Sequence, residues 1–158
     1  MTGACLREGG AADVDSAMTV MVRAFDPIFG EAWSRGQCLG ILSLPDVWLS
    51  LAEDPAGTVV GFTLSRMTVD EAELLLLAVD PAARRQGIGA ALIARAATVA
   101  SARGARRLLL EMRADNPALT LYERAGFAAI GRRQGYYRGA GGQVRDAITL
   151  ARTLYSPD

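Results

Sequence analysis

The segment Arg84-Arg85-Gln86-Gly87-Ile88-Gly89 places two cations and two glycines between two apolar segments. The continuous apolar run before it, Leu74 to Val79, predicts a buried strand. After it, apolar residues recur at helical spacing from Ile88 to Ala100 and predict a long helix ending near Gly104. The start of a helix presents unpaired N–H groups, glycines let a ligand approach the backbone, and arginines bond phosphate oxygens. The segment therefore predicts a turn that binds a phosphate or pyrophosphate group.

Two common nucleotide-binding motifs do not fit this turn. The Rossmann pattern requires a glycine at position 92, where the chain has Leu92. The Walker pattern requires Gly-Lys followed by Ser or Thr, which is missing here. A plainer alternative is a capped helix whose arginines are solvated.

The chain contains no histidine. Ser-His-Asp and Cys-His nucleophile systems are therefore excluded, as is the helical His pair of zinc proteases. Acid-base chemistry must then come from carboxylates, phenols, thiols or water. The two cysteines, Cys5 and Cys38, are too few and too far apart for a metal site or a disulfide framework. We expect both to be small buried apolar residues, and we expect no metal.

The composition is that of one globular domain spanning residues 1–158, with 51% hydrophobic and 22% charged residues. Lys and Arg together number 17, as do Asp and Glu, so no overall field favours nucleic acid or an anionic membrane. Met1 to Gly10 carries Arg7 and Glu8 where a signal peptide needs an apolar core. We expect a cytoplasmic protein that binds neither DNA nor membranes.

The spacing of apolar residues predicts an alternation of helices and strands. Helices are expected at 13–25, after Ser34 to 42, at 88–104 and at 116–125, and strands at 47–51, 59–67, 74–79, 108–112, 127–130 and 147–154. The strand, helix and strand from Leu74 to Met112 predict a right-handed parallel unit, with the first strand central and buried on both faces. The expected fold is a mixed α/β sheet flanked by helices, closed by a strand pair around the loop Gly139 to Gly142.

Arg84, Gly87 and Gly89 match Arg/Gln-x-x-Gly-x-Gly/Ala, the pyrophosphate pattern of the GNAT family of N-acetyltransferases. Within that family the chain resembles the RimI-type ribosomal-protein alanine N-acetyltransferases, densely from Asp70 to Leu150. The other segments that carry the resemblance are Asp70-Glu71-Ala72, Ala78-Val79-Asp80-Pro81, Leu110 to Asn116, Leu121 to Phe127, Arg132 to Tyr137 and Asp146-Ala147-Ile148. It implies a GNAT-like single domain: a mixed, mostly antiparallel twisted sheet of about six or seven strands, flanked by about four helices, around a central parallel β-α-β unit.

The resemblance also implies that acetyl-CoA is the co-substrate. Its pantetheine arm would lie beside the backbone of Leu77, Ala78 and Val79, with the thioester between two splayed strands. The residues expected at the pyrophosphate are Arg84, Arg85, Gln86, Gly87, Ile88, Gly89 and Ala90. Asn116 would bond the pantetheine amides, cap its helix, or do both.

Two residues are implied as the acid-base pair of the reaction. Glu111, the acidic side chain of an apolar strand, would be the general base, and its alternative is to point to solvent or to pair with Arg113. Tyr122 would be the general acid that protonates the departing thiolate, and its alternative is a core contact beside Phe127. An α-amino acceptor, with a pKa of about 7.7–8.0, needs less help from such a base than a lysine side chain, whose pKa is about 10.4.

The acceptor groove is less clearly marked. The residues that would surround it in enzymes of this type are Trp33, Glu71, Tyr136 and Tyr137, for which ordinary packing and an exposed turn charge are equal alternatives. Arg132, Arg133 and Arg138 are expected in a solvated turn, although they could meet an acidic peptide or RNA.

The chain also departs from the RimI-type pattern at two points. The interval from Asn116 to Tyr122 is one residue shorter, which would turn a rigid helix by about 100° unless its first turn absorbs the difference. Leu76 stands where relatives usually have Asn or Ser, so a polar contact near the acceptor is lost.

The sequence predicts an enzyme that moves acetyl from acetyl-CoA to a primary amine by direct attack. The favoured acceptor is a protein N-terminal α-amino group, as in RimI-type enzymes that act on an N-terminal Ala of a ribosomal protein. A small-molecule amine acetyltransferase is the alternative among enzymes, because the residues before Asp70 carry the weakest resemblance. A non-catalytic acyl-CoA-binding or regulatory module is the alternative of another class, and the presence of Glu111 and Tyr122 counts against it.

Overall fold

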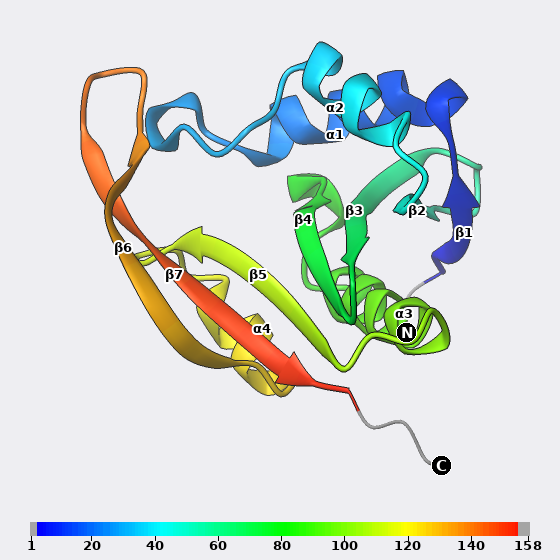
Figure 1. The fold of residues 1–158 in the computed structure, drawn as a ribbon. Coiled ribbons are helices and arrows are strands. Elements are labelled where there is room, and N and C mark those ends of the chain that lie inside the picture. The colour runs from blue at the N-terminus through cyan, green and yellow to red at the C-terminus, as the bar shows by residue number, and fades with distance from the viewer. Residues whose placement is uncertain (1–2, 155–158) are drawn as a thin grey trace.

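A computed structural model describes residues 3–154, so the first two and last four residues of the expected 1–158 domain lie outside the described part. One sheet of seven strands has the order β1-β2-β3-β4-β5-β7-β6 (Figure 1). The strands are β1 (Cys5–Gly9), β2 (Val47–Glu53), β3 (Val59–Thr68), β4 (Glu71–Val79), β5 (Arg107–Arg113), β6 (Ala128–Arg138) and β7 (Val144–Thr153). The helices are α1 (Val14–Ala24), α2 (Arg35–Leu42), α3 (Ile88–Ala102) and α4 (Leu119–Arg124), with short 3-10 turns η1 (Ala11–Asp13), η2 (Pro27–Phe29) and η3 (Pro81–Ala83).

The predicted fold class is confirmed. β4 and β5 are parallel and joined by α3, whereas the other neighbouring strands are antiparallel. α1 packs on one face of the sheet with Leu49, Phe62 and Leu64, and α3 packs on the other face, with Leu108 in its cluster. Figure 1 shows α1 and α2 together on one side of the sheet and α3 and α4 on the other.

β4 lies at the centre of the sheet, as predicted, but its residues alternate between buried and half-buried rather than being buried on both faces. Leu75 is a β-bulge, because Leu64 pairs with Leu76 whereas the next residue of β3 pairs with Leu74. A bulge inserts one residue and changes which face the following side chains occupy. Leu74 accordingly packs in the cluster under α3, and Leu76 packs in the cluster under α1.

The parallel pairing of β4 with β5 is short. It runs from Glu71 with Arg107 to Leu74 with Leu110, and Figure 1 shows the two strands separating beyond that point. The backbone of β4 after Leu74 therefore lacks ladder partners on its β5 side. Because unpaired backbone N–H and C=O groups need water or a ligand, this edge is suited to binding.

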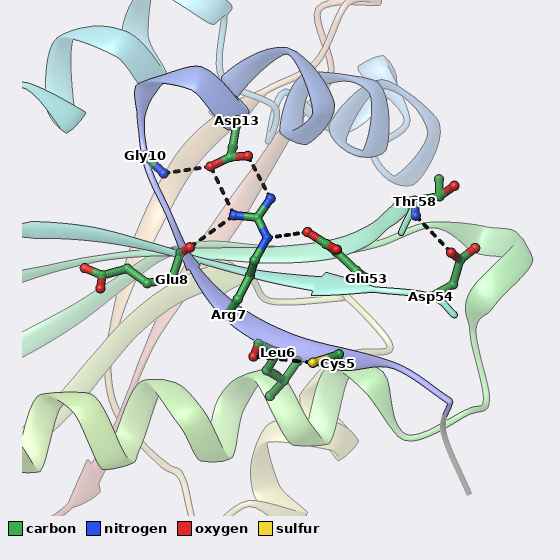
Figure 2. Close-up of polar contacts among 9 residues, drawn as sticks. All are labelled: Cys5, Leu6, Arg7, Glu8, Gly10, Asp13, Glu53, Asp54 and Thr58. Carbon is green, nitrogen blue, oxygen red and sulfur yellow. Dashed lines mark hydrogen bonds and ion pairs between the residues drawn. The ribbon is translucent and has the colours of Figure 1, made fainter. Parts of the chain in front are cut away.

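The N-terminal strand β1 was not predicted. Arg7 bonds Asp13 at 2.9 Å and also bonds Glu53, while Asp13 accepts the Gly10 N–H at 2.9 Å (Figure 2). These contacts tie β1 to β2 and to the start of the first helix. Cys5 lies on this edge strand and is exposed, so its predicted burial is wrong, whereas the predicted burial of Cys38 is confirmed. Successive side chains of a strand point to opposite faces, and here the half-buried Leu6 takes the packed face while its neighbour Cys5 points away from it.

The C-terminal hairpin is longer than the sequence predicted. β6 extends through Arg132, Arg133 and Arg138, so these arginines lie on a strand and not in a turn. The pairing with β7 is irregular between Ala129 and Gly131, and again between Arg133 and Tyr137, where Gly135 has a φ of +62°. This irregularity hid the strand, because it breaks the regular alternation from which strands are recognised. α4, by contrast, is shorter than the predicted helix over 116–125.

No helix among residues 3–154 is long and apolar enough to cross a membrane. The expected cytoplasmic location stays a prediction.

The tip of the β6–β7 hairpin touches the segment between α1 and α2. The Ala140 N–H donates to the Pro27 carbonyl at 3.3 Å. A Cβ built on Gly139 would lie 1.5 Å from the Ile28 carbonyl oxygen, and one on Gly30 would lie 2.3 Å from that of Arg138. Two segments far apart in the sequence therefore meet backbone to backbone, which only glycine permits.

Gly139→Ala is expected to separate the hairpin tip from this segment and to lower the free energy of unfolding by about 1–3 kcal/mol, because the added methyl group has no room. Gly141→Ala is the matched control, since no atom lies within 4 Å of its Cβ, and it should change stability by less than about 0.5 kcal/mol. Urea denaturation measures both. Equal effects of the two substitutions would contradict the close contact.

Candidate active site

A cavity of about 730 Å³ opens where β4 and β5 separate. It brings together the predicted pyrophosphate-binding turn at residues 84–90 (the anion turn), the two diverging strands, the start of α4 and Tyr137 of β6. The residues singled out in the sequence that line it are Leu77, Ala78, Val79, Arg84, Arg85, Gly87, Ile88, Gly89, Ala90, Glu111, Asn116, Tyr122 and Tyr137. Gln86 is the one residue of the turn that lies outside this lining.

Local hydrogen bonds shape the anion turn. The Asp80 carboxylate accepts the Ala82 N–H at 2.9 Å and so starts η3 directly after β4. Arg85 and Gly87 then take positive φ values of +65° and +78°, and α3 begins at Ile88. Successive residues in such conformations point their N–H groups toward one side, as helix starts do. The turn can therefore surround an anion with backbone donors.

The arginines of the turn differ in their contacts. The Arg84 guanidinium donates to the Ala24 carbonyl at 3.3 Å, which holds it beside the end of α1. Both Arg84 and Arg85 line the cavity next to the helix start. On α3, a Cβ added to Gly89 would lie 3.2 Å from Leu121 of α4, so this glycine lets α4 approach closely. Donors and close backbone approach together fit a pyrophosphate group.

Glu111 lies on β5 with its side chain 20% exposed. One carboxylate oxygen pairs with the Arg133 guanidinium at 3.0 Å. The sequence had offered Arg113 as an alternative partner, but Arg113 lies against Glu31 and Asp115 instead. Glu111 thus lines the cavity while an exposed arginine of β6 holds it from the side.

Tyr122 is 8% exposed and faces the cavity from α4. Its ring also meets Phe127 edge to face at 5.7 Å, so the core contact proposed as an alternative exists as well. Burial raises the pKa of its phenol, and the nearby Glu31 carboxylate and Tyr137 raise it further. α4 begins only at Leu119, so the residues between Asn116 and this helix form a turn and not a rigid helix.

Asn116 makes two contacts. Its Oδ1 accepts the Ala118 N–H at 2.9 Å in the turn before α4, and its Nδ2 donates to Glu31 at 3.3 Å. It therefore orders the turn before the helix, three residues ahead of Leu119, and it lines the cavity.

Sequence reasoning missed three residues of this site. Glu31 and Phe29 line the cavity from the segment between α1 and α2, and Arg113 lines it from the end of β5. The Arg113 guanidinium stacks on the Phe29 ring at 3.5 Å and lies 3.5 Å from Glu31. The segment between α1 and α2 consists mostly of loop residues, so no periodic pattern in the sequence placed Phe29 and Glu31 beside β5.

The expected acceptor residues are only partly brought together. Tyr137 lines the cavity, and its ring meets Tyr136 edge to face at 5.1 Å, but Tyr136 is half exposed under Arg133. Glu71 pairs with Arg107 at 2.6 Å where β4 starts, beside the paired and not the open end of the two strands.

Trp33 packs on the cluster under α1, and Leu76 is buried in that cluster and lines the cavity. Of the four expected acceptor residues, the structure therefore places Tyr137 in the cavity lining and the other three outside it. The expectation that the site needs no metal stays a prediction.

The model of the acetyltransferase (GNAT) family matches residues 19–127. A ribosomal protein bS18 alanine N-acetyltransferase of Escherichia coli (strain K12) is 40% identical over 96 residues, which are 60% of this chain and 64%, just under two thirds, of that protein. A crystal structure of the ribosomal-protein-S18-alanine N-acetyltransferase from Escherichia coli superimposes with a TM-score of 0.86 at 28% identity, covering 98% of this chain and 96% of that one.

Arabidopsis thaliana NAA60, solved in complex with acetyl-CoA, has a TM-score of 0.80 at 21% identity over 96% of this chain and 98% of that one. The same architecture thus holds acetyl-CoA in that protein.

Alkaline pH tests the buried phenols. Because burial raises the pKa of Tyr122 and Tyr137, both stay neutral in the folded protein at a pH where they ionise in the unfolded chain. This contribution to stability is complete below a pH of about 10, the pKa of an unfolded tyrosine, and is lost as the pH rises above it. Tyr122→Phe should remove up to about 1.4 kcal/mol of that loss per pH unit in urea titrations above a pH of about 10.

Phe127→Leu is the control for this measurement, because it disturbs the same ring pair without removing an ionisable group. It should keep the pH dependence of the wild-type protein. An unchanged alkaline slope in Tyr122→Phe would contradict the burial of the phenol.

Proposed function

The chain belongs to the acetyltransferase (GNAT) family, and from this premise we propose that it transfers an acetyl group from acetyl-CoA to a primary amine. The observation that carries the proposal is the cavity between β4 and β5, which holds the anion turn together with Glu111 and Tyr122. The N–H groups of the turn, with Arg84 and Arg85, suit the pyrophosphate of CoA. The open edge of β4 at Leu77, Ala78 and Val79 suits the amides of its pantetheine arm.

In the proposed reaction the amine nitrogen attacks the thioester carbonyl carbon directly, and the C–S bond breaks. Glu111 accepts the proton that the amine loses, and Tyr122 donates toward the sulfur as negative charge develops there. The raised pKa of Tyr122 keeps its phenol protonated, so it is a hydrogen-bond donor throughout the neutral range. The protein itself forms no covalent bond, which agrees with a chain that has no histidine.

The proposed acceptor is a protein N-terminal α-amino group, in the manner of the RimI-type enzymes. The similarity to the Escherichia coli enzyme supports this choice, although the aligned region spans 64% of that relative's length. Chemistry supports it too, because an α-amino group is substantially neutral near pH 7.4, whereas a lysine costs about 4 kcal/mol to deprotonate there. A single carboxylate such as Glu111 is then a sufficient base.

Release of CoA from acetyl-CoA, measured over a panel of amines, tests this function. We expect the highest kcat/KM with a peptide bearing an N-terminal Ala, and lower values with spermidine, an aminoglycoside and a peptide whose only amine is a lysine side chain. A preference for spermidine or the aminoglycoside would indicate a small-molecule enzyme. Binding of acetyl-CoA without turnover of any amine would indicate a non-catalytic module.

Glu111→Gln is expected to lower kcat by about 10²–10⁴-fold, because the amide cannot accept a proton from the amine. The KM for acetyl-CoA should change little, since the anion turn is untouched. Glu73→Gln is the matched control, because Glu73 lies on neighbouring β4 and pairs with Arg66 outside the cavity lining. Full activity in Glu111→Gln would remove this residue from the mechanism.

A further inference from the structure

A second carboxylate lines the cavity besides Glu111. Glu31 lies between η2 and α2, and its side chain is 11% exposed. The acid-base steps proposed above assign it no task. An anionic carboxylate that is largely removed from water is costly unless cations or hydrogen-bond donors face it. The groups that surround the Glu31 carboxylate therefore indicate which kind of ligand it binds.

The contacts that hold Glu31 are long. Arg113 Nε lies 3.5 Å from Oε1, and Asn116 Nδ2 lies 3.3 Å from Oε2. The shorter ion pair of Arg113, at 2.6 Å, is with Asp115, and the buried Arg113 Nε has no hydrogen-bond partner among the described residues. A carboxylate can accept about four hydrogen bonds. Glu31 thus keeps accepting capacity toward the cavity.

The other walls around Glu31 belong to the reaction site. Glu31, the buried Tyr122 and the partly buried Tyr137 line the same cavity, and the charge of Glu31 contributes to raising the pKa of both phenols. Glu111 contributes to the same effect on Tyr137. Tyr137 therefore lies within the electrostatic reach of both carboxylates, so an acceptor amine near these groups would meet both Glu31 and Glu111.

Charge is unevenly distributed along the cavity. Arg84 and Arg85 stand with the N-terminus of α3 at the anion turn. Glu31 and Glu111 stand where β5, the α1–α2 segment and β6 converge, where Arg113 lies 3.5 Å from Glu31 and the exposed Arg133 pairs with Glu111 at 3.0 Å. Such a layout suits a polyanion at one end and a cation at the other.

We propose that Glu31 is the acceptor-binding carboxylate, which receives the amine in its ammonium form and holds it beside Glu111. Glu111 takes the first proton of the ammonium and passes it to water, and it then accepts the second proton when the neutral amine attacks, as in the reaction proposed above. This inference rests on the proposed acetyl transfer and adds the residue that binds the acceptor and the protonation state in which the acceptor arrives. Arg113, stacked on Phe29, and Asn116 orient Glu31 without neutralising it at short range.

Steady-state kinetics of Glu31→Gln test this assignment, with the best acceptor among the N-terminal Ala peptide, the lysine peptide and spermidine. The acceptor KM is expected to rise by about 10- to 100-fold below pH 7, the usual effect of losing a hydrogen bond to a charged group. The KM for acetyl-CoA should stay near the wild-type value, because the anion turn is untouched. The ratio of mutant to wild-type acceptor KM should shrink as the pH rises above the pKa of the amine. A neutral amine is not attracted by the charge of the Glu31 carboxylate, so removing that charge then matters less.

Asp115→Asn is the matched control. Asp115 also pairs with Arg113, at 2.6 Å, but its side chain is 57% exposed and lies outside the cavity lining. If Glu31 acted only by holding Arg113, both variants would raise the acceptor KM alike and without pH dependence, and the assignment would be wrong. Glu31→Asp keeps the charge and should recover part of the lost affinity, which also covers the case in which Glu31→Gln folds poorly.

Absence of amine-dependent CoA release by the wild-type protein overturns the proposed function, and Glu31 falls with it. Turnover by the wild-type protein together with an unchanged acceptor KM in Glu31→Gln leaves the acetyl transfer standing and overturns only the role of Glu31.

Discussion

The early end of the parallel ladder between β4 and β5 is the constraint on which the rest of this structure depends. Pairing stops at Leu74 and Leu110, and the bulge at Leu75 lies directly beyond that point. The backbone of β4 is left without partners on one side in the middle of a sheet, a condition that proteins otherwise avoid. A co-substrate with amides of its own can complete that edge. The cavity and the open backbone are therefore consequences of one interruption in the sheet, and the anion turn follows directly after the open end of β4.

Closing the acceptor end of this cavity requires contacts between segments that are distant in the sequence. The hairpin tip at Gly139 reaches the α1–α2 segment, and the Arg113 guanidinium stacks on Phe29 of the same segment. Arg113 is buried, and a buried guanidinium is tolerated only with carboxylates and aromatic faces around it. The charges that hold the segment in place are thus the same charges that define the electrostatic character of the site.

The sequence predicted those features that depend on neighbouring residues. The helix starting after Ser34 is one example, because the Ser34 side chain accepts the Gln37 N–H and the Gln37 side chain accepts the Ser34 N–H. Features with an irregular backbone were predicted poorly. The prediction ended β6 at Ile130, where its register with β7 shifts between Ala129 and Gly131. β1 was missed because a short edge strand tied by Arg7 has little apolar pattern.

The sequence alone determined the anion turn, the order of strand, helix and strand around it, and the exclusion of histidine chemistry. Each of these follows from residue types within a few positions of one another, where spacing fixes which backbone groups and side chains coincide. Only the tertiary structure decided that Glu111 pairs with Arg133 and not Arg113, that Glu71 stands outside the cavity lining, and that Glu31 lines the cavity. Such pairings depend on strand register and on the crossing of loops over the sheet, which no local pattern encodes.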